Sequence, residues 1–261
     1  MPHARVNGID LYYESYGSGD DAVVFAHGLG GNHLSWWQQI PAFEQRYRCV
    51  VFDHRGFGAS PDAPSGPGIR AFVEDLRGLL DHLGIDRTYI VGQSMGGFTT
   101  LGFALAYPDR TRAIVMADTT FPYIGPETRA MMRRQGERAR TAPDTLRGVA
   151  YSEAYARRDR EGAFLYDAIS RLNPPRPDDF FAPQRLPPSP SKDELASLSV
   201  PALFLCGADD PLFPPSVMEA ASALVPGSRL VVVPDAGHSV YWEQPRAFNE
   251  AVLGFFEECR A

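Results

Sequence analysis

The strongest constraint on the fold is a repeated alternation of short apolar runs with stretches of helical period. The apolar runs are rich in Val, Ile and Phe and begin at Ala22, Tyr47, Thr88, Arg112, Pro201 and Ser228. Amphipathic stretches follow over 71–83, 95–107 and 217–225, and another closes the chain over 247–259. Buried strands that alternate with helices form mostly parallel sheets with right-handed crossovers. We therefore predict an α/β fold.

The opening residues add a strand pair of a different kind. The segment "VNGIDLYYESYG" alternates apolar and polar residues, and Asn7-Gly8 suits a tight turn between antiparallel strands. Together with the six apolar runs, this hairpin predicts an eight-stranded, mostly parallel sheet flanked by helices. A chain of 261 residues, 44% of them hydrophobic, is long enough to bury one large core.

Residues 121–198 interrupt the alternation. They contain "ETRAMMRRQGERAR", a second basic stretch "YARRDREGAFLYDAISRL" and the proline-rich "NPPRPDDFFAPQRLPPSPS". Proline at this density is incompatible with a central strand or a continuous helix. We therefore predict a core of 1–120 and 199–261, with a mostly helical cap inserted over 121–198 after the sixth strand. The arginine-rich face of the cap is either simply solvated or steers anionic substrates.

Composition argues against several classes of protein. The formal net charge of -7 and the pI near 5.4 give no support to a nucleic-acid partner. No stretch approaches the ~20 apolar residues that span a bilayer, and "MPHARVNGID" lacks the apolar segment of a signal peptide. We expect a cytoplasmic protein, a monomer or a homodimer, without a membrane partner. Neither C-x-x-C nor H-E-x-x-H occurs, so no metal site is expected.

One predicted strand runs directly into "GQSMGG", which gives the pattern Gly92-x-Ser94-x-Gly96. A tight turn from a strand into a helix strains its central residue, and glycines two positions away allow the chain to pass close to its neighbours. The Ser94 hydroxyl then projects at a helix N-terminus, where the helix dipole favours developing negative charge. The pattern predicts a nucleophile; the alternative is an ordinary N-cap serine.

A serine nucleophile needs a base, and "PDAGHSVYWEQP" supplies His238 in a glycine-flanked loop. Of the six histidines, this one lies between the last predicted strand and the terminal helix. His27, His33 and His54 follow early strands and could line the same cleft. The alternative for His238 is a loop histidine that packs on Trp242.

The base in turn needs a carboxylate at the same edge of the sheet, which orients the imidazole. Asp210 lies four residues beyond "LFLC" and gives the chain order Ser, Asp, His. Its neighbour Asp209 is interpreted as a turn residue. Asp118, at the end of "IVMAD", reaches the same edge and is a competitor. Asp53, at the end of "VVFD", is better explained as a support for the following "HRGFG" loop.

The oxyanion formed in acyl transfer needs two preorganised donors. We predict the backbone N–H of Met95, directly after the serine, and that of Leu29 in "HGLGG", where glycines allow close approach to a substrate. The glycine loop followed by Asp53 also resembles a dinucleotide-binding unit. His33, however, stands where the third glycine of G-x-G-x-x-G would be, counted from Gly28, so this alternative is disfavoured.

Together, "HGLGG", "DHRGFGAS", "GQSMGG", "CGADDP" and "AGHSVYWEQP" resemble the α/β-hydrolase family and span nearly the whole chain outside the insertion. The chain is most similar to the small bacterial esterase, lactonase and carbon-carbon hydrolase branches, in which a helical cap enters after the sixth strand. The resemblance implies an acid in the G-x-x-D block from Gly207 to Asp210. Some lactone-cleaving relatives place the acid after the sixth strand, which would select Asp118.

Three departures narrow the resemblance. Ser94 disfavours the branches that use an aspartate nucleophile. Hydrolases of ring-cleavage products typically carry a tryptophan directly after the histidine, where this chain has Ser239. Cofactor-independent peroxidase relatives often carry an aromatic residue at the position of Leu29, so peroxidase activity is not indicated for this chain.

We therefore expect a serine hydrolase that cleaves a carboxylic ester or lactone through Ser94, His238 and Asp210, by way of an acyl-enzyme and without a cofactor. Candidate substrate-binding residues are Phe121, Tyr123 and Val240, for which plain core packing is the alternative. Two other functions stay open: a carbon-carbon bond hydrolase or lyase with the same triad, and a ligand-binding sensor with slow turnover.

Overall fold

The computed structural model describes residues 2–63, 66–120, 148–176 and 179–260. Its centre is one sheet of eight strands in the order β1-β2-β4-β3-β5-β6-β7-β8. The strands are β1 (His3–Val6), β2 (Ile9–Tyr16), β3 (Ala22–Ala26), β4 (Arg48–Phe52), β5 (Thr88–Gln93), β6 (Thr111–Ala117), β7 (Ala202–Gly207) and β8 (Arg229–Val233). Strands β3 to β8 pair in parallel, while β1 and β2 pair antiparallel with each other and β2 antiparallel with β4.

The amino-terminal hairpin turns at the predicted Asn7-Gly8. Both residues have positive φ, 43° and 80°, which is the requirement of a tight hairpin turn whose twist matches that of its strands. Pairing then runs from Val6 with Ile9 to His3 with Tyr12. The hairpin places β1 at one edge of the sheet.

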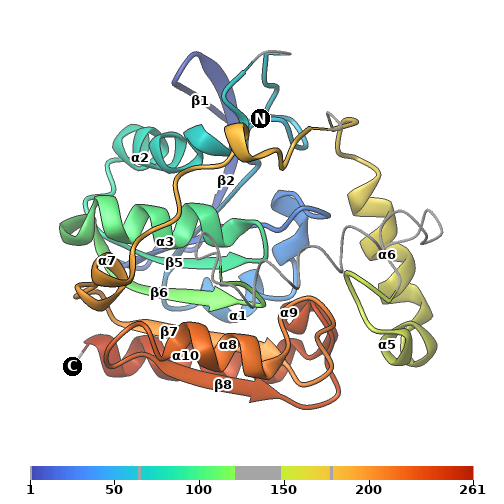
Figure 1. Cartoon of the computed structure of the whole chain (residues 1–261). Helices are drawn as coiled ribbons and strands as arrows, with labels where there is room; N and C mark the ends of the chain where they lie inside the picture. Colours follow the sequence, from blue (N-terminus) through green and yellow to red (C-terminus); the bar gives the residue numbers. More distant parts are fainter. Residues whose placement is uncertain (1, 64–65, 121–147, 177–178, 261) are drawn as a thin grey trace.

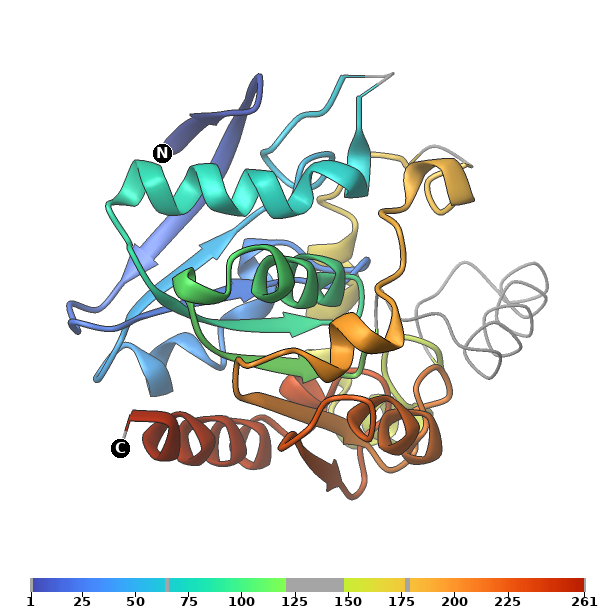
Figure 2. The same cartoon turned by 60° about the vertical axis from the view of Figure 1, so that its left-hand side comes forward.

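Helices cover both faces of the sheet. Those packed on the strands are α1 (Ile40–Phe43), α2 (Phe72–Leu83), α3 (Gly96–Ala106), α8 (Pro215–Ser222) and α10 (Pro245–Arg260). Short helical turns are η1 (His33–Trp36), η2 (Gly68–Ala71), η3 (Pro108–Arg110) and α9 (Val240–Glu243). Figure 2 shows α2 in teal and α3 in green on one side of the sheet, and α10 in dark red on the other.

The core consists of two hydrophobic clusters, one on each face. Because successive strand residues point to opposite faces, Val24 and Ile90 join the cluster with α2, α3 and α8, whereas Val23 and Val91 join the cluster with α1 and α10. Burying one such side chain contributes roughly 1.5–3 kcal/mol. This continuous burial explains why the strands read as unbroken apolar runs.

Between β6 and β7 the described residues are mainly helical and irregular. They form α5 (Glu153–Arg158), α6 (Arg160–Ser170), η4 (Pro183–Arg185) and α7 (Lys192–Ala196). Ser152 and Asp159 cap α5 and α6 by accepting hydrogen bonds from backbone N–H groups of the first turn. Figure 1 shows α5 and α6 at the side toward which the arrows of the parallel strands point. The first basic stretch predicted for the cap lies outside the described residues.

The carboxyl ends of parallel strands meet at one edge, where loops from different parts of the chain come together. The segments that follow β3, β5, β6, β7 and β8 supply the side chains of the candidate site.

Within the part of the chain that the structure describes, no helix is both long and apolar enough to cross a membrane.

Candidate active site

Ser94 lies in a sharp turn between β5 and α3. Its φ is +50°, a conformation that residues other than glycine rarely adopt. A Cβ on Gly92 would lie 2.1 Å from Thr100 Oγ1, and one on Gly96 would lie 2.1 Å from the Ala26 carbonyl oxygen. Glycine is therefore required on both sides of Ser94, because the turn packs directly on its neighbours.

His238 connects Ser94 to an acid. Its Nε2 lies 2.9 Å from Ser94 Oγ, and its Nδ1 lies 3.0 Å from Asp210 Oδ2. Gln93, next to the serine, donates from Nε2 to the His238 carbonyl oxygen at 2.8 Å. The Phe213 ring stacks on the imidazole with 5.7 Å between ring centres. These contacts hold the ring in an orientation suited to proton transfer from the serine.

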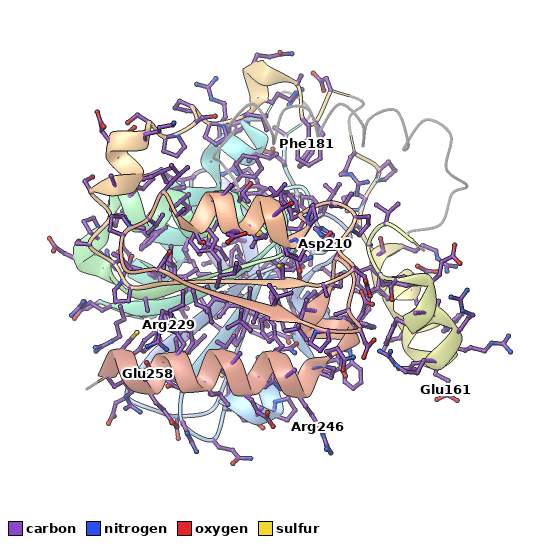
Figure 3. All side chains as sticks on the ribbon, turned by 60° about the horizontal axis from the view of Figure 1, so that its bottom comes forward. Glu161, Phe181, Asp210, Arg229, Arg246 and Glu258 are labelled. Atoms are coloured by element: carbon purple, nitrogen blue, oxygen red, sulfur yellow. The ribbon has the colours of Figure 1, made fainter. Side chains whose placement is uncertain are left out.

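Asp210 is fixed by its own loop. Its Oδ1 accepts hydrogen bonds from the backbone N–H groups of Leu212 at 2.7 Å and Phe213 at 3.0 Å, which leaves Oδ2 for the imidazole. Figure 3 shows Asp210 inside the molecule, whereas Glu161, Arg246 and Glu258 lie at its periphery. The neighbouring Asp209 is exposed, and its backbone N–H donates to the Ala236 carbonyl.

Asp118, the competing acid, lies at the same edge but has other partners. Its carboxylate accepts from the N–H of Gly207 at 3.2 Å and of Val240 at 3.1 Å. Its φ is +50° and its side chain is fully buried. Burial, together with the nearby charge of Asp210, raises the pKa of Asp118 well above its usual range. Asp118 thus ties the ends of β6 and β7 to the segment after His238.

Both predicted oxyanion donors lie beside Ser94. Met95 directly follows the serine, and Leu29 lines the same cavity as Ser94 and His238. Within the described residues neither backbone N–H donates a hydrogen bond to the protein. A Cβ on Gly28 would lie 2.0 Å from Gln93 Oε1, so glycine at this position lets the Leu29 loop approach the serine turn closely.

Two buried histidines support the Leu29 loop. The His54 N–H donates to His27 Nε2 at 3.0 Å, so the ring hydrogen of His27 is on Nδ1, which donates to the Gly28 carbonyl at 2.8 Å. Burial lowers the pKa of His27 to about 4 and that of His54 well below its usual value. The sequence left open whether these rings line the cleft; both are buried, and neither belongs to the described lining of the cavity at Ser94.

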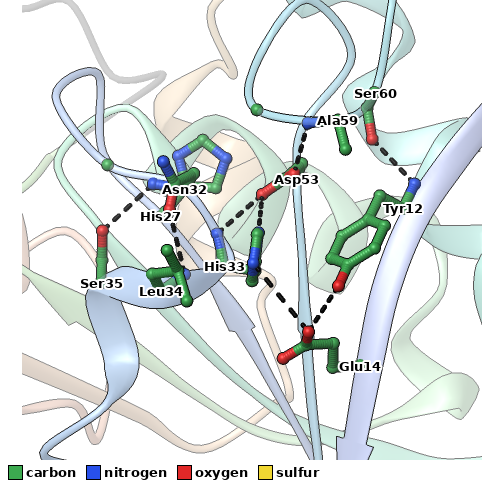
Figure 4. Close-up of polar contacts among 12 residues, drawn as sticks. Tyr12, Glu14, His27, Asn32, His33, Leu34, Ser35, Asp53, Ala59 and Ser60 are labelled. Carbon is green, nitrogen blue, oxygen red and sulfur yellow. Dashed lines mark hydrogen bonds and ion pairs between the residues drawn. The ribbon is translucent and has the colours of Figure 1, made fainter. Parts of the chain in front are cut away.

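His33 and Asp53 form a second histidine–aspartate pair. Asp53 Oδ1 accepts from the backbone N–H and from Nδ1 of His33, at 2.7 and 2.8 Å, while its Oδ2 accepts from the Ala59 N–H. Figure 4 shows His33 between Asp53 and Glu14. As the sequence indicated, Asp53 supports the loop that follows it; its contact with His33 was not predicted.

Contacts with the predicted cap start next to His238. The Ser239 hydroxyl donates to the Ala150 carbonyl at 2.5 Å, and the Ser152 hydroxyl donates to Glu243 Oε2 at 2.6 Å. Burial raises the pKa of Glu243. No local sequence pattern reveals these contacts, because the partners are 89 and 91 residues apart.

The cavity at Ser94 has a volume of about 120 Å³. Its described lining consists of Leu29, Gly30, Gln93, Ser94, Val149, Ala150, Tyr166, Ser170, Arg176, Leu212 and His238. Val240 is fully buried in the cluster around α10 and is not part of this described lining, which favours the packing alternative for its side chain. Phe121 and Tyr123 lie outside the described residues.

Comparison with known proteins assigns the chain to a family. Residues 21–245 match the family described as the alpha/beta hydrolase fold. The chain belongs to the α/β-hydrolase family. This α/β-hydrolase is 31% identical over 255 residues to 3-oxoadipate enol-lactonase 2 of Acinetobacter baylyi, covering 94% of this chain and 92% of the relative.

Two further relatives of this α/β-hydrolase differ in substrate. The 2-hydroxy-6-oxononadienedioate/2-hydroxy-6-oxononatrienedioate hydrolase 1 of Dechloromonas aromatica is 29% identical over 95% of this chain and 90% of its own length. The solved structure of a thermophilic esterase from Thermogutta terrifontis is 30% identical, with a TM-score of 0.82 over 100% of this chain and 99% of the esterase. The predicted fold class is confirmed, and the family supports hydrolysis of a small molecule.

Proposed function

We propose that this α/β-hydrolase is a serine hydrolase that cleaves a carboxylic ester or lactone of modest size through an acyl-enzyme. The observation that carries the proposal is a single imidazole in contact with both a strained serine and a buried carboxylate: His238 lies 2.9 Å from Ser94 Oγ and 3.0 Å from Asp210 Oδ2. Nucleophile, base and orienting acid at these distances are what acyl transfer requires.

In the proposed first step, His238 Nε2 accepts the Ser94 proton while Oγ attacks the substrate carbonyl. Asp210 stabilises the resulting imidazolium through Nδ1–H. The N–H groups of Leu29 and Met95 receive the oxyanion, where loss of one such donor typically costs about 10²–10³ in rate. His238 then returns the proton to the leaving alkoxide, which departs and leaves an ester on Ser94.

In the second step, His238 deprotonates a water molecule that attacks the acyl-enzyme. The tetrahedral intermediate collapses, Ser94 Oγ recovers a proton from His238, and the carboxylic acid leaves. A lactone follows the same course, except that its alkoxide stays attached to the acyl group and the product is a hydroxy acid.

We propose that the chain is divided into a catalytic core and an inserted cap. Residues 1–120 and 199–261 form the catalytic core, and 121–198 form a cap that shapes access for the substrate. We propose a cytoplasmic monomer or homodimer that needs no cofactor, metal, nucleic acid or membrane for turnover.

Carbon-carbon bond hydrolysis is the second candidate, favoured by the similarity to the oxononadienedioate hydrolase of Dechloromonas aromatica. The residue after His238 argues for the ester, because it is Ser239, whereas hydrolases of ring-cleavage products typically carry a tryptophan at this position. Parallel assays with vinylogous diketones and simple esters separate the two reactions.

A fluorophosphonate probe tests the mechanism. We expect a single adduct on Ser94, located by peptide mass spectrometry, and ester turnover in the unlabelled protein. Labelling elsewhere would contradict the assigned nucleophile. Stoichiometric capture of an ester with negligible turnover would instead favour a ligand-binding sensor.

A further inference from the structure

Arg176 contributes a positive charge to the wall of the cavity that contains Ser94 and His238. It follows the two prolines of "NPPRP" in the segment after α6, and proline restricts the backbone there. The guanidinium Nη1 donates to the carbonyl oxygen of Leu29 at 3.3 Å. This contact directs the cation toward the loop that carries a proposed oxyanion donor.

Among the described residues, nothing neutralises the charge of Arg176. No carboxylate in that part of the chain pairs with it, and no acidic side chain belongs to the described lining of the cavity. Arg176 is an exposed residue, but partial desolvation lowers the pKa of its guanidinium, and no carboxylate in the described ranges raises it. Guanidinium has five N–H donors, of which the Leu29 contact uses one.

Two other arginines, in a neighbouring cavity, are paired with carboxylates. It has a volume of about 420 Å³ and is lined by Arg55, Arg176 and Arg185, among others. Arg55 pairs with Asp75 at 2.6 Å and Asp62 at 3.2 Å, and Arg185 pairs with Asp179 at 2.9 Å. Of these three arginines, Arg176 is the one without a carboxylate partner among the described residues, and it also lines the catalytic cavity.

We propose that Arg176 binds an anionic group of the substrate, so that the preferred substrates are esters or lactones that carry a carboxylate on a short acyl group. The inference rests on the proposed function and specifies its substrate class. A planar guanidinium binds carboxylate with two parallel hydrogen bonds, which orients the acyl group as well as attracting it. The cavity at Ser94, with a volume of about 120 Å³, suits a short acyl group.

Two esters with the same acyl length test the inference: mono-4-nitrophenyl succinate, which is anionic, and methyl 4-nitrophenyl succinate, which is neutral. We expect wild type to prefer the anionic ester in kcat/KM. In Arg176→Gln the anionic-to-neutral ratio should fall about tenfold to a hundredfold, mainly through KM, because a hydrogen-bonded charge pair is lost. Arg176→Lys should retain part of the preference.

Arg185→Gln is the matched control, since it removes an arginine of the neighbouring cavity that is already paired with an acid. Its anionic-to-neutral ratio should equal that of wild type. A ratio in Arg176→Gln equal to that of wild type, with ester hydrolysis intact, would overturn the inference and leave the proposed function standing. Thermal melting checks that each variant is folded.

Calorimetric titration with succinate separates the inference from the proposed function. Wild type should bind succinate, and Arg176→Gln should bind it at least about tenfold more weakly. If neither ester is hydrolysed but this difference is found, the proposed function fails and the anion site stands. Equal binding by the two proteins, or no binding by either, overturns the anion site.

Discussion

The pairs His238–Asp210 and His33–Asp53 have almost the same geometry and different surroundings. The nitrogen-to-oxygen distances are 3.0 and 2.8 Å, and both aspartate side chains are fully buried. The difference lies at the second ring nitrogen, which in His238 faces Ser94 Oγ at 2.9 Å and in His33 faces Glu14 at 4.0 Å. A histidine–aspartate pair is therefore not a catalytic site by itself.

The partner of the second nitrogen decides what each imidazole can do. Between two carboxylates a ring is stabilised as a cation: burial opposes protonation of His33, but the hydrogen bond and charge of Asp53 outweigh it and raise the pKa of His33. Between a carboxylate and a hydroxyl, a ring can take up the hydroxyl proton. The same two residue types thus provide a structural ion pair in one place and a candidate base in the other.

Removal of the Ser94 hydroxyl should have the largest effect on turnover. Ser94→Ala should lower kcat for a 4-nitrophenyl ester by about 10⁴-fold or more, because the proposed nucleophile is lost while the two donors and the cavity remain. Steady-state assays at matched protein concentration measure the loss. Turnover near the wild-type level would refute the mechanism.

Exchanging the acid in each pair should give unequal effects. Asp210→Asn should lower kcat by about 10⁴-fold, because the imidazole loses both its orientation and the charge that stabilises imidazolium. Asp53→Asn, the matched control, should lower kcat by less than about tenfold, since it weakens loop support and the His33 ion pair but touches neither Ser94 nor His238. Equal losses in the two variants would remove the distinction between the pairs.

Asp118→Asn sharpens the assignment of the acid. Because Asp118 accepts from backbone N–H groups and it is Asp210 that contacts the His238 imidazole, we expect kcat to fall by less than about tenfold. The free energy of unfolding should fall by about 1–3 kcal/mol, because one of the N–H groups of Gly207 and Val240 loses its acceptor. A kcat lower than that of Asp210→Asn would make Asp118 the acid.

The smallest expected effect is a pH dependence of stability from His33. A raised pKa in the folded state adds stability that is fully present below the unfolded value of ~6.5 and is lost as pH rises through the folded value. The stability advantage of wild type over His33→Gln should therefore be greater at pH 5.5 than at pH 8. Urea unfolding at both pH values measures it, and a constant difference would contradict the ion pair.

Local sequence patterns predicted the fold and the positions of the turns around the candidate site. Apolar runs located β3 to β8, Asn7-Gly8 located the hairpin turn, and Gly92-x-Ser94-x-Gly96 located the serine turn, because each depends on neighbouring residues. Bounds shifted by one or two residues at most of these elements, as at α2, which begins at Phe72. Sequence patterns were therefore sufficient for those elements whose conformation is set by residues close together in the chain.

Spatial choices could not be made in the same way. Asp118 and Asp210 both lie in segments that follow strands at one sheet edge, and only the packing of these segments determines which carboxylate meets His238. His33–Asp53 joins two loops 20 residues apart, and Arg176 lies in a proline-rich segment without periodicity. In each case the informative signal is a long-range distance, which a single sequence does not contain.

The contacts of Ser239 and Glu243 with Ala150 and Ser152 have a consequence for grafting. They link residues beside the candidate base to the segment that begins α5. A chimaera that exchanges this segment for that of a relative therefore also replaces part of the scaffold of His238. Such a graft needs a hydroxyl at position 152 and a carbonyl at the site of Ala150, or its new substrate range will be confounded with a displaced imidazole.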